Sequence, residues 1–242
     1  MKIILLGTGD AIGTPRIGCS CPQCSRAQKT GEERLRTSLM VTKAGHTVLV
    51  DTGPDLRRQL LSHGSPHVDA VLWTHGHYDH FMGFGEFYRV QKMPRVYAPR
   101  PVMDYCGGIF GFLPFERHVL GEYDPFSLFG IEFSFLPVNH PPAYTCGLLI
   151  TDGNVRVGYT SDTNRTIPAR TREALTGVDL LLVDALLPAG LHVPKHMNYK
   201  EACELARELH AGDFRCVHIS HLVPWDLPHL GKDGETFCFS SP

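Results

Sequence analysis

The fold is decided by the stretch Ala70-Val71-Leu72-Trp73-Thr74-His75-Gly76-His77-Tyr78-Asp79-His80. Its first five residues form an apolar run that is typical of a buried strand. Four side chains that can bind metal follow within the next six residues. In an extended segment His75 and His77 point the same way, so both imidazoles can reach one ion. The chain is then expected to turn at Tyr78 into a helix-like segment, Phe81–Val90, which would carry Asp79 and His80 toward a second ion. A solvated histidine-rich loop is the alternative, but the buried strand before the histidines argues against it.

Strand-like runs extend along the rest of the chain, rich in Val, Ile, Leu, Phe and Tyr and bounded by turn residues. With Ala70–Thr74 they are Lys2–Leu6, Ser38–Thr42, Thr47–Asp51, Val96–Ala98, Ile131–Val138, Gly147–Thr151, Arg156–Thr160, Leu180–Asp184 and Arg215–Ile219. Short turns between the early strands favour antiparallel pairing. Helices are expected at Pro54–His63, Pro168–Leu175 and Tyr199–Leu209, the last with a capping box of Asn198 and Glu201. The pattern predicts a mixed α/β protein, with two packed sheets and helices outside them.

Composition limits what the protein can do. The 242 residues include 23 Lys and Arg and 25 Asp and Glu, a net charge of −2, which disfavours a polybasic nucleic-acid surface. The longest apolar runs are far shorter than a membrane span, and the first residues do not resemble a secretory signal. No linker or repeat divides the chain. We therefore expect one domain over residues 1–242, in the cytoplasm and without a membrane partner.

The motif His75-x-His77-x-Asp79-His80 resembles the signature of the metallo-β-lactamase superfamily of dinuclear metal hydrolases. The other positions that fit this superfamily all stand at predicted strand ends: Asp51-Thr52-Gly53, His140, Asp162 and His218. The resemblance reaches from the start of the chain to about residue 222. It implies an αββα sandwich, in which two mixed sheets pack face to face.

Carried onto this sequence, the resemblance assigns a role to each of seven side chains. One metal would be held by His75, His77 and His140. The other would be held by Asp79, His80 and His218, with Asp162 bridging the two. Imidazoles and carboxylates suit Zn²⁺, Mn²⁺ or Fe²⁺, and Mn²⁺ or Zn²⁺ is expected here. Two such ions activate a bridging hydroxide and neutralise the oxygens of a phosphoryl group.

A second candidate metal site is the cluster Cys19-Ser20-Cys21-Pro22-Gln23-Cys24. Three thiolates at this spacing can bind one tetrahedral Zn²⁺, but a closed structural site needs a fourth ligand. His221 is the best candidate, because a turn after His218 would point the second imidazole away from the first. A redox pair of Cys21 and Cys24 and a set of free thiols are the competing interpretations.

The cysteine cluster together with His218-x-x-His221 is similar to the phosphoribosyl 1,2-cyclic phosphate phosphodiesterase family of phosphonate degradation. That resemblance implies a structural zinc on the three cysteines and His221. It also implies catalytic roles for Asp79, which would orient the nucleophile, and for His196, which would protonate the leaving oxygen. The expected reaction converts 5-phosphoribosyl 1,2-cyclic phosphate to ribose 1,5-bisphosphate. Arg165 or Lys195 could bind the terminal phosphate.

Other functions use the same metal motif. A tRNA 3′-processing endonuclease usually adds a long flexible arm, which nothing here resembles, and thiolester or lactone hydrolysis is open to the same metals. A carrier resembling the pyrroloquinoline-quinone B protein would have no reason to keep all seven ligands. We therefore expect an enzyme with a small phosphodiester substrate. Because the family tends to form dimers, a homodimer is also expected to be possible. Residues 101–117 and 224–242 are less similar to the family than the rest of the chain is.

Overall fold

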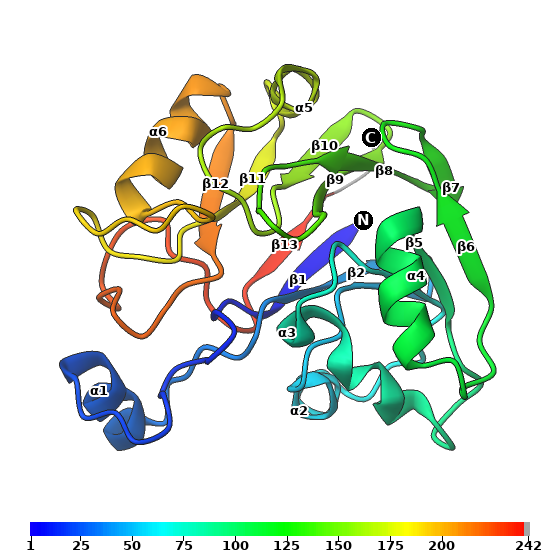
Figure 1. Ribbon diagram of the computed structural model, residues 1–242, viewed down its shortest axis with the longest axis horizontal. Coiled ribbons are helices and arrows are strands. Elements are labelled where there is room, and N and C mark those ends of the chain that lie inside the picture. Colours follow the sequence, from blue (N-terminus) through cyan, green and yellow to red (C-terminus); the bar gives the residue numbers. More distant parts are fainter. Residues whose placement is uncertain (240–242) are drawn as a thin grey trace.

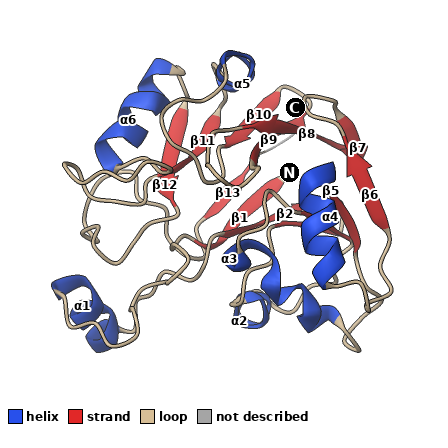
Figure 2. Cartoon of the chain, in the orientation of Figure 1, coloured by secondary structure: helices blue, strands red, loops and turns tan. Residues whose placement is uncertain are grey.

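Two β-sheets stand face to face in the computed structural model, which describes residues 1–239. Figure 1 shows the sheets side by side, with α5 and α6 outside one of them and α2 to α4 outside the other. Figure 2 shows the same arrangement as a strand interior between helical outer layers. The predicted αββα sandwich is confirmed.

The first sheet has the strand order β13-β1-β2-β3-β4-β5-β6. Its strands are β1 Lys2–Gly7, β2 Ser38–Lys43, β3 His46–Val50, β4 Ala70–Leu72, β5 Arg95–Pro99, β6 Arg117–Leu120 and β13 Thr236–Cys238. β1, β2 and β3 pair antiparallel. A short turn joins β2 to β3, as predicted, but the connection from β1 to β2 runs over residues 8–37. β3 to β6 pair parallel, which places several strand ends at one edge. Residues 240–242, the end of the segment 224–242, lie outside the described residues.

The second sheet has the order β12-β11-β10-β9-β8-β7. Its strands are β7 Phe126–Leu128, β8 Ile131–Pro137, β9 Cys146–Asp152, β10 Val155–Tyr159, β11 Leu180–Asp184 and β12 Asp213–Val217. β10, β11 and β12 are parallel, and β7 to β10 are antiparallel. Three short strands, β6, β7 and β13, were not expected from the sequence, because each has only three or four residues and takes its place from neighbouring strands.

The helices are α1 Pro22–Thr30, α2 Leu56–Ser62, α3 Tyr78–Phe81, α4 Arg100–Ile109, α5 Ala169–Leu175 and α6 Tyr199–Glu208, with a 3₁₀ helix, η1, at Met82–Phe87. The capping box that starts α6 is present. α1 and α4 were not expected from the sequence. Gly107 and Gly108 in α4 are poor helix formers, but Val102, Met103 and Cys106 bury one helix face against the first sheet. Tertiary packing therefore outweighs local propensity.

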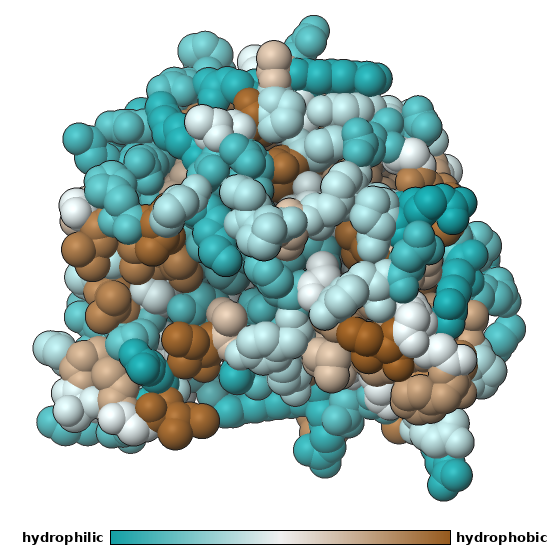
Figure 3. All heavy atoms as spheres, in the orientation of Figure 1, coloured by the Kyte–Doolittle hydropathy of each residue, from teal (hydrophilic) through white to brown (hydrophobic). Residues whose placement is uncertain are grey.

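Three apolar clusters hold the layers together. The central one lies between the sheets and includes Phe133, Phe135 and Leu148, all fully buried. One outer cluster, around Trp73, joins the first sheet to α4 and η1. The other joins the second sheet to α5 and α6. The face in Figure 3 is mostly hydrophilic, with apolar side chains in scattered groups. Among residues 1–239, the helices are too short or too polar to cross a bilayer.

Candidate metal centre

The histidine motif lies where β4 gives way to a helix. The backbone stays extended after Leu72, and His75 forms an isolated antiparallel bridge with Thr145 from the facing sheet. His77 is the extended residue at the N-cap of α3. The helix then turns Asp79 and His80 inward, where both are buried. The strand–turn–helix that the sequence predicts is therefore present, although the helix begins at Tyr78 and continues as 3₁₀.

The first group of converging side chains contains His75, His77, His140 and Asp162, with one ligand atom from each lying within 4.8 Å of the others. Nε2 of His140 is 3.1 Å from Nδ1 of His77. Nε2 of His75 is 3.6 Å from Oδ2 of Asp162. His140 follows β8 and Asp162 follows β10, so the facing sheet completes a group that the motif begins.

The second group contains Asp79, His80 and His218. Oδ2 of Asp79 is 3.2 Å from Nε2 of His80 and 3.6 Å from Nε2 of His218. Asp162 lies between the two groups. Its Oδ1 is 3.4 Å from Nε2 of His80, and its Oδ2 is 3.3 Å from Nε2 of His218. One carboxylate thus contacts imidazoles of both groups.

Unpaired atoms within the two groups show that they fit metal ions. Nε2 of His75, His80 and His218 and one oxygen each of Asp79 and Asp162 are buried without a hydrogen-bond partner. Such orphaned atoms are costly in a folded protein unless a ligand satisfies them. Five lone pairs directed into one polar space suit divalent cations that prefer nitrogen and oxygen ligands.

The electrostatics favour positive charge at the same place. Burial lowers the pKa of His80, but the carboxylates of Asp162 and Asp79 outweigh it and raise this pKa well above its usual value. The pKa of His218 is also raised well above its usual value, because nearby carboxylates, Asp162 first, outweigh the effect of burial. Burial lowers the pKa of His75 well below its usual value, which keeps this imidazole neutral and able to bind metal. The carboxylates thus create a negative potential at the centre, and this potential favours the binding of a cation.

A second layer of hydrogen bonds orients these ligands. Asp51 accepts hydrogen bonds from Nδ1 of His80 at 2.7 Å and from the hydroxyl of Thr74 at 2.8 Å. The Thr74 oxygen in turn accepts one from Nδ1 of His75 at 3.0 Å. Nδ1 of His140 donates to the carbonyl of Lys195 at 2.9 Å. Each imidazole therefore presents Nε2 to the centre. The sequence analysis placed Asp51 at a strand-end turn but missed Thr74.

His196 lies beside the centre, as its predicted catalytic role requires. Its ring stacks on that of His218 at 5.0 Å between centroids. Its Nδ1 donates to Oδ2 of Asp184 at 2.8 Å. One ring nitrogen of His196 lies within 4.8 Å of ligand atoms of Asp162 and His218. Asp184, fully buried at the end of β11, also brings Oδ1 to 3.7 Å from Nδ1 of His218. Sequence reasoning missed Asp184, although its place at the end of an apolar strand is a signal that it shares with Asp51.

Arg165 was expected at the substrate rim, and the structure contradicts this. Its guanidinium donates to the carbonyl of Glu201 and forms an ion pair with Glu208, both on α6. The side chain is therefore bound to a helix rather than free for a phosphate. Lys195 is the other candidate cation. Its backbone carbonyl accepts a hydrogen bond from Nδ1 of His140 at 2.9 Å, so Lys195 lies beside the centre.

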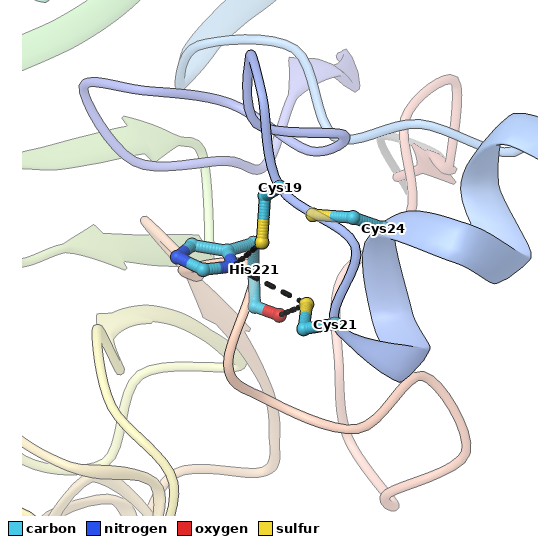
Figure 4. Close-up of side chains that lie close together, drawn as sticks. All are labelled: Cys19, Cys21, Cys24 and His221. Carbon is cyan, nitrogen blue, oxygen red and sulfur yellow. Dashed lines mark hydrogen bonds between the residues drawn. The ribbon is translucent and has the colours of Figure 1, made fainter.

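The cysteine cluster converges as well. Cys19, Cys21, Cys24 and His221 each bring one ligand atom within 4.8 Å of the others, and Figure 4 shows the sulfurs gathered at the imidazole. Nδ1 of His221 is 3.5 Å from the sulfur of Cys19 and 3.4 Å from that of Cys21. Burial opposes ionisation, but the N–H of Cys24 and the imidazole lower the pKa of Cys21 to about 6. Four ligands at one point favour zinc over the redox pair, which would leave Cys19 and His221 without a role.

The fold and site define a class that comparison with known proteins confirms. A model of the beta-lactamase superfamily domain matches residues 46–219, and the chain belongs to that superfamily, as a metal-dependent hydrolase. The crystal structure of a new diphosphatase from the PhnP family is 31% identical, with a TM-score of 0.87 over 98% of this chain and 96% of that one. Within the superfamily, the chain belongs to the PhnP family.

Two further relatives show how widely the fold is used. The structure of Zn²⁺-bound PqqB from Methylobacterium extorquens has a TM-score of 0.85 over 99% of this chain and all of that one, at 20% identity. The Octanoyltransferase of Porphyromonas gingivalis is 29% identical over 95% of this chain. This chain spans 48% of that relative's length.

Proposed function

We propose that this protein hydrolyses a small phosphodiester at a centre of two divalent metal ions. The observation that carries the proposal is Asp162, whose carboxylate lies within 3.6 Å of His75, His80 and His218. His75, His77 and His140 would hold one ion, and Asp79, His80 and His218 would hold the other. Asp162 would contribute to both sites. When bound, Mn²⁺ or Zn²⁺ would lower the pKa of water and neutralise phosphoryl oxygens.

The protein's own residues supply the rest of the chemistry. Asp79 is positioned to orient the attacking water as well as to bind metal. His196 has Nε2 free, and this atom is placed to give a proton to the departing oxygen. Asp184 holds the ring of His196 through Nδ1. Asp184 is therefore a positioning residue, because it acts through His196.

Replacing His196 by Gln should lower kcat about 10²-fold for a diester with an alkoxide leaving group. For a p-nitrophenyl ester the loss should be much smaller, because that leaving group departs without a proton. Steady-state kinetics with both esters measure the difference. Asp184→Asn should give the same pattern in weaker form. An equal loss on both esters would remove the general-acid role.

The substrate that the PhnP family suggests is 5-phosphoribosyl 1,2-cyclic phosphate. Water adds to phosphorus, the ring bond from phosphorus to the 2-oxygen breaks, and that oxygen takes up a proton, which leaves ribose 1,5-bisphosphate. We propose Lys195 for binding the terminal phosphate, because its carbonyl contacts His140 and because Arg165 is paired with Glu208.

A ³¹P NMR time course with Mn²⁺-loaded protein tests this function. We expect the cyclic phosphate to open rapidly to a monoester, beside an activated aryl diester as a positive control. Cleavage of the aryl diester alone would support the diester chemistry and overturn the substrate. No reaction of either compound would overturn the phosphodiesterase function itself.

A second candidate, hydrolysis of an acyl thiolester, is favoured by the likeness to an Octanoyltransferase. The same metals would polarise a thiolester carbonyl. Release of thiol from an octanoyl thiolester, followed with a thiol reagent, would support this candidate if it exceeded diester cleavage.

We also propose that Cys19, Cys21, Cys24 and His221 bind one structural zinc.

A further inference from the structure

Two residues at the metal centre have backbone conformations that non-glycine residues rarely adopt. The φ angles of His218 and Asp51 are 56° and 62°. Such left-handed conformations cost free energy, and they persist only where the surrounding structure holds them. His218 is a proposed metal ligand, and Asp51 accepts a hydrogen bond from another, His80. The contacts that hold these two backbones therefore decide where two imidazoles point.

The backbone of His218 is held by a threonine from a distant part of the chain. The N–H of His218 donates to Oγ1 of Thr37 at 3.2 Å, and both residues are buried. The same hydroxyl donates to the carbonyl of Gly9 at 2.8 Å. One oxygen thus accepts from the N–H while its proton goes to the carbonyl. Thr37 therefore ties the ligand that follows β12 of the second sheet to the loop that follows β1 of the first.

The next residue, Ser38, holds Asp51 in a similar manner. Its Oγ donates to the backbone carbonyl of Asp51 at 2.9 Å, and Ser38 is also buried. The carboxylate of Asp51 in turn accepts from Nδ1 of His80 at 2.7 Å. His80 and His218 belong to the same group of ligands. Two adjacent hydroxyls therefore support one group from two directions.

We propose that Thr37 and Ser38 are positioning residues for the ion that the second group of ligands would hold. The inference rests on the two-metal centre of the proposed function and adds the residues that hold one half of it. Both hydroxyls contact backbone atoms, so they act on the direction of the imidazoles. Without the hydroxyl of Thr37, the N–H of His218 would be buried without this partner, which is costly, and the left-handed backbone would lose a support.

Calorimetric titration with Mn²⁺ tests the proposal in the absence of substrate. Mn²⁺ prefers carboxylate oxygens to thiolates, so the cysteine cluster does not contribute. We expect the wild-type protein to bind two Mn²⁺. In Thr37→Val, which keeps the shape of the side chain, the dissociation constant of one ion should rise about tenfold, as loss of a hydrogen bond behind a metal ligand typically causes. The affinity for the other ion should not change.

Three further variants sharpen this test. Thr37→Ser keeps the hydroxyl and should bind both ions as the wild-type protein does. Ser38→Ala should weaken the same ion as Thr37→Val. His77→Ala assigns the ions, because His77 belongs to the first group only. In that background Thr37→Val should still weaken the ion that remains.

Thr171→Val is the matched control. Thr171 is also a fully buried threonine, and its hydroxyl donates to a backbone carbonyl, that of Pro137, at 2.7 Å. It lies on α5 and contacts neither group of ligands. The substitution should cost stability and leave both Mn²⁺ affinities unchanged.

Unchanged Mn²⁺ affinities in Thr37→Val, an equal loss for both ions, or a Thr37→Ser protein as weak as Thr37→Val would overturn the proposal. Should Thr37→Val fail to fold, normal binding of both ions by Ser38→Ala would overturn it. The ³¹P experiment succeeds or fails separately. Absence of diester cleavage together with the expected Mn²⁺ affinities would contradict the function but not the positioning role. Binding of fewer than two Mn²⁺ by the wild-type protein would overturn both.

Discussion

Asp162→Ala is expected to lower kcat by at least about 10³-fold on any diester substrate, because it removes the one carboxylate that contacts both ligand groups. His75 would then lose its carboxylate contact, and Asp79 would be the carboxylate left beside Nε2 of His80 and His218, so metal affinity should fall as well. Steady-state kinetics at saturating Mn²⁺ and the metal content after dialysis, measured by mass spectrometry, test both effects.

Asp152→Asn is the matched control for this substitution. Asp152 is also a buried carboxylate, but it pairs with Lys43 and the N-terminal amine, far along β9 from the metal centre. We expect it to cost stability and to leave turnover and metal content unchanged. Near-normal turnover in a metal-replete Asp162→Ala protein would contradict the two-metal mechanism.

Cys24→Ser is expected to release one equivalent of zinc and to lower Tm by on the order of 10 °C, since loss of a structural zinc costs several kcal/mol. The sulfur of Cys24 is fully buried and accepts a hydrogen bond from the N–H of Arg16. The cluster fastens α1, which lies apart from both sheets in Figure 1, to the loop at His221. Zinc stoichiometry and calorimetric unfolding measure the two effects.

Cys238→Ser controls for the loss of a thiol as such, because Cys238 is exposed on β13 and lies outside the cluster. It should change neither the zinc content nor the Tm. If Cys24→Ser retains all its zinc, the cluster is not a structural metal site, and the redox pair becomes the better interpretation.

Much of the fold follows from local pattern. Apolar runs of three to eight residues predicted ten of the thirteen strands of residues 1–239, and the capping box of Asn198 and Glu201 marked the start of α6. These features depend on residues near one another in the chain, so they can be detected without knowledge of the tertiary structure. The spacing of the histidine motif likewise predicted that His75 and His77 bind one ion. It predicted that Asp79 and His80 bind a second, because an extended segment is followed by a helical turn.

The sequence by itself thus determined the strand framework, the histidine motif and the cysteine cluster, and a family resemblance named the distant ligands. Only the tertiary structure brought Asp162 between the two groups, paired Asp184 with His196 and bound Arg165 to Glu208. It also placed Tyr105 against Gly76. The reason is physical: these contacts join residues that are at least 12 positions apart in the chain, and the packing of the layers decides which residues meet. Local periodicity records which face of an element is buried, but not what it is buried against.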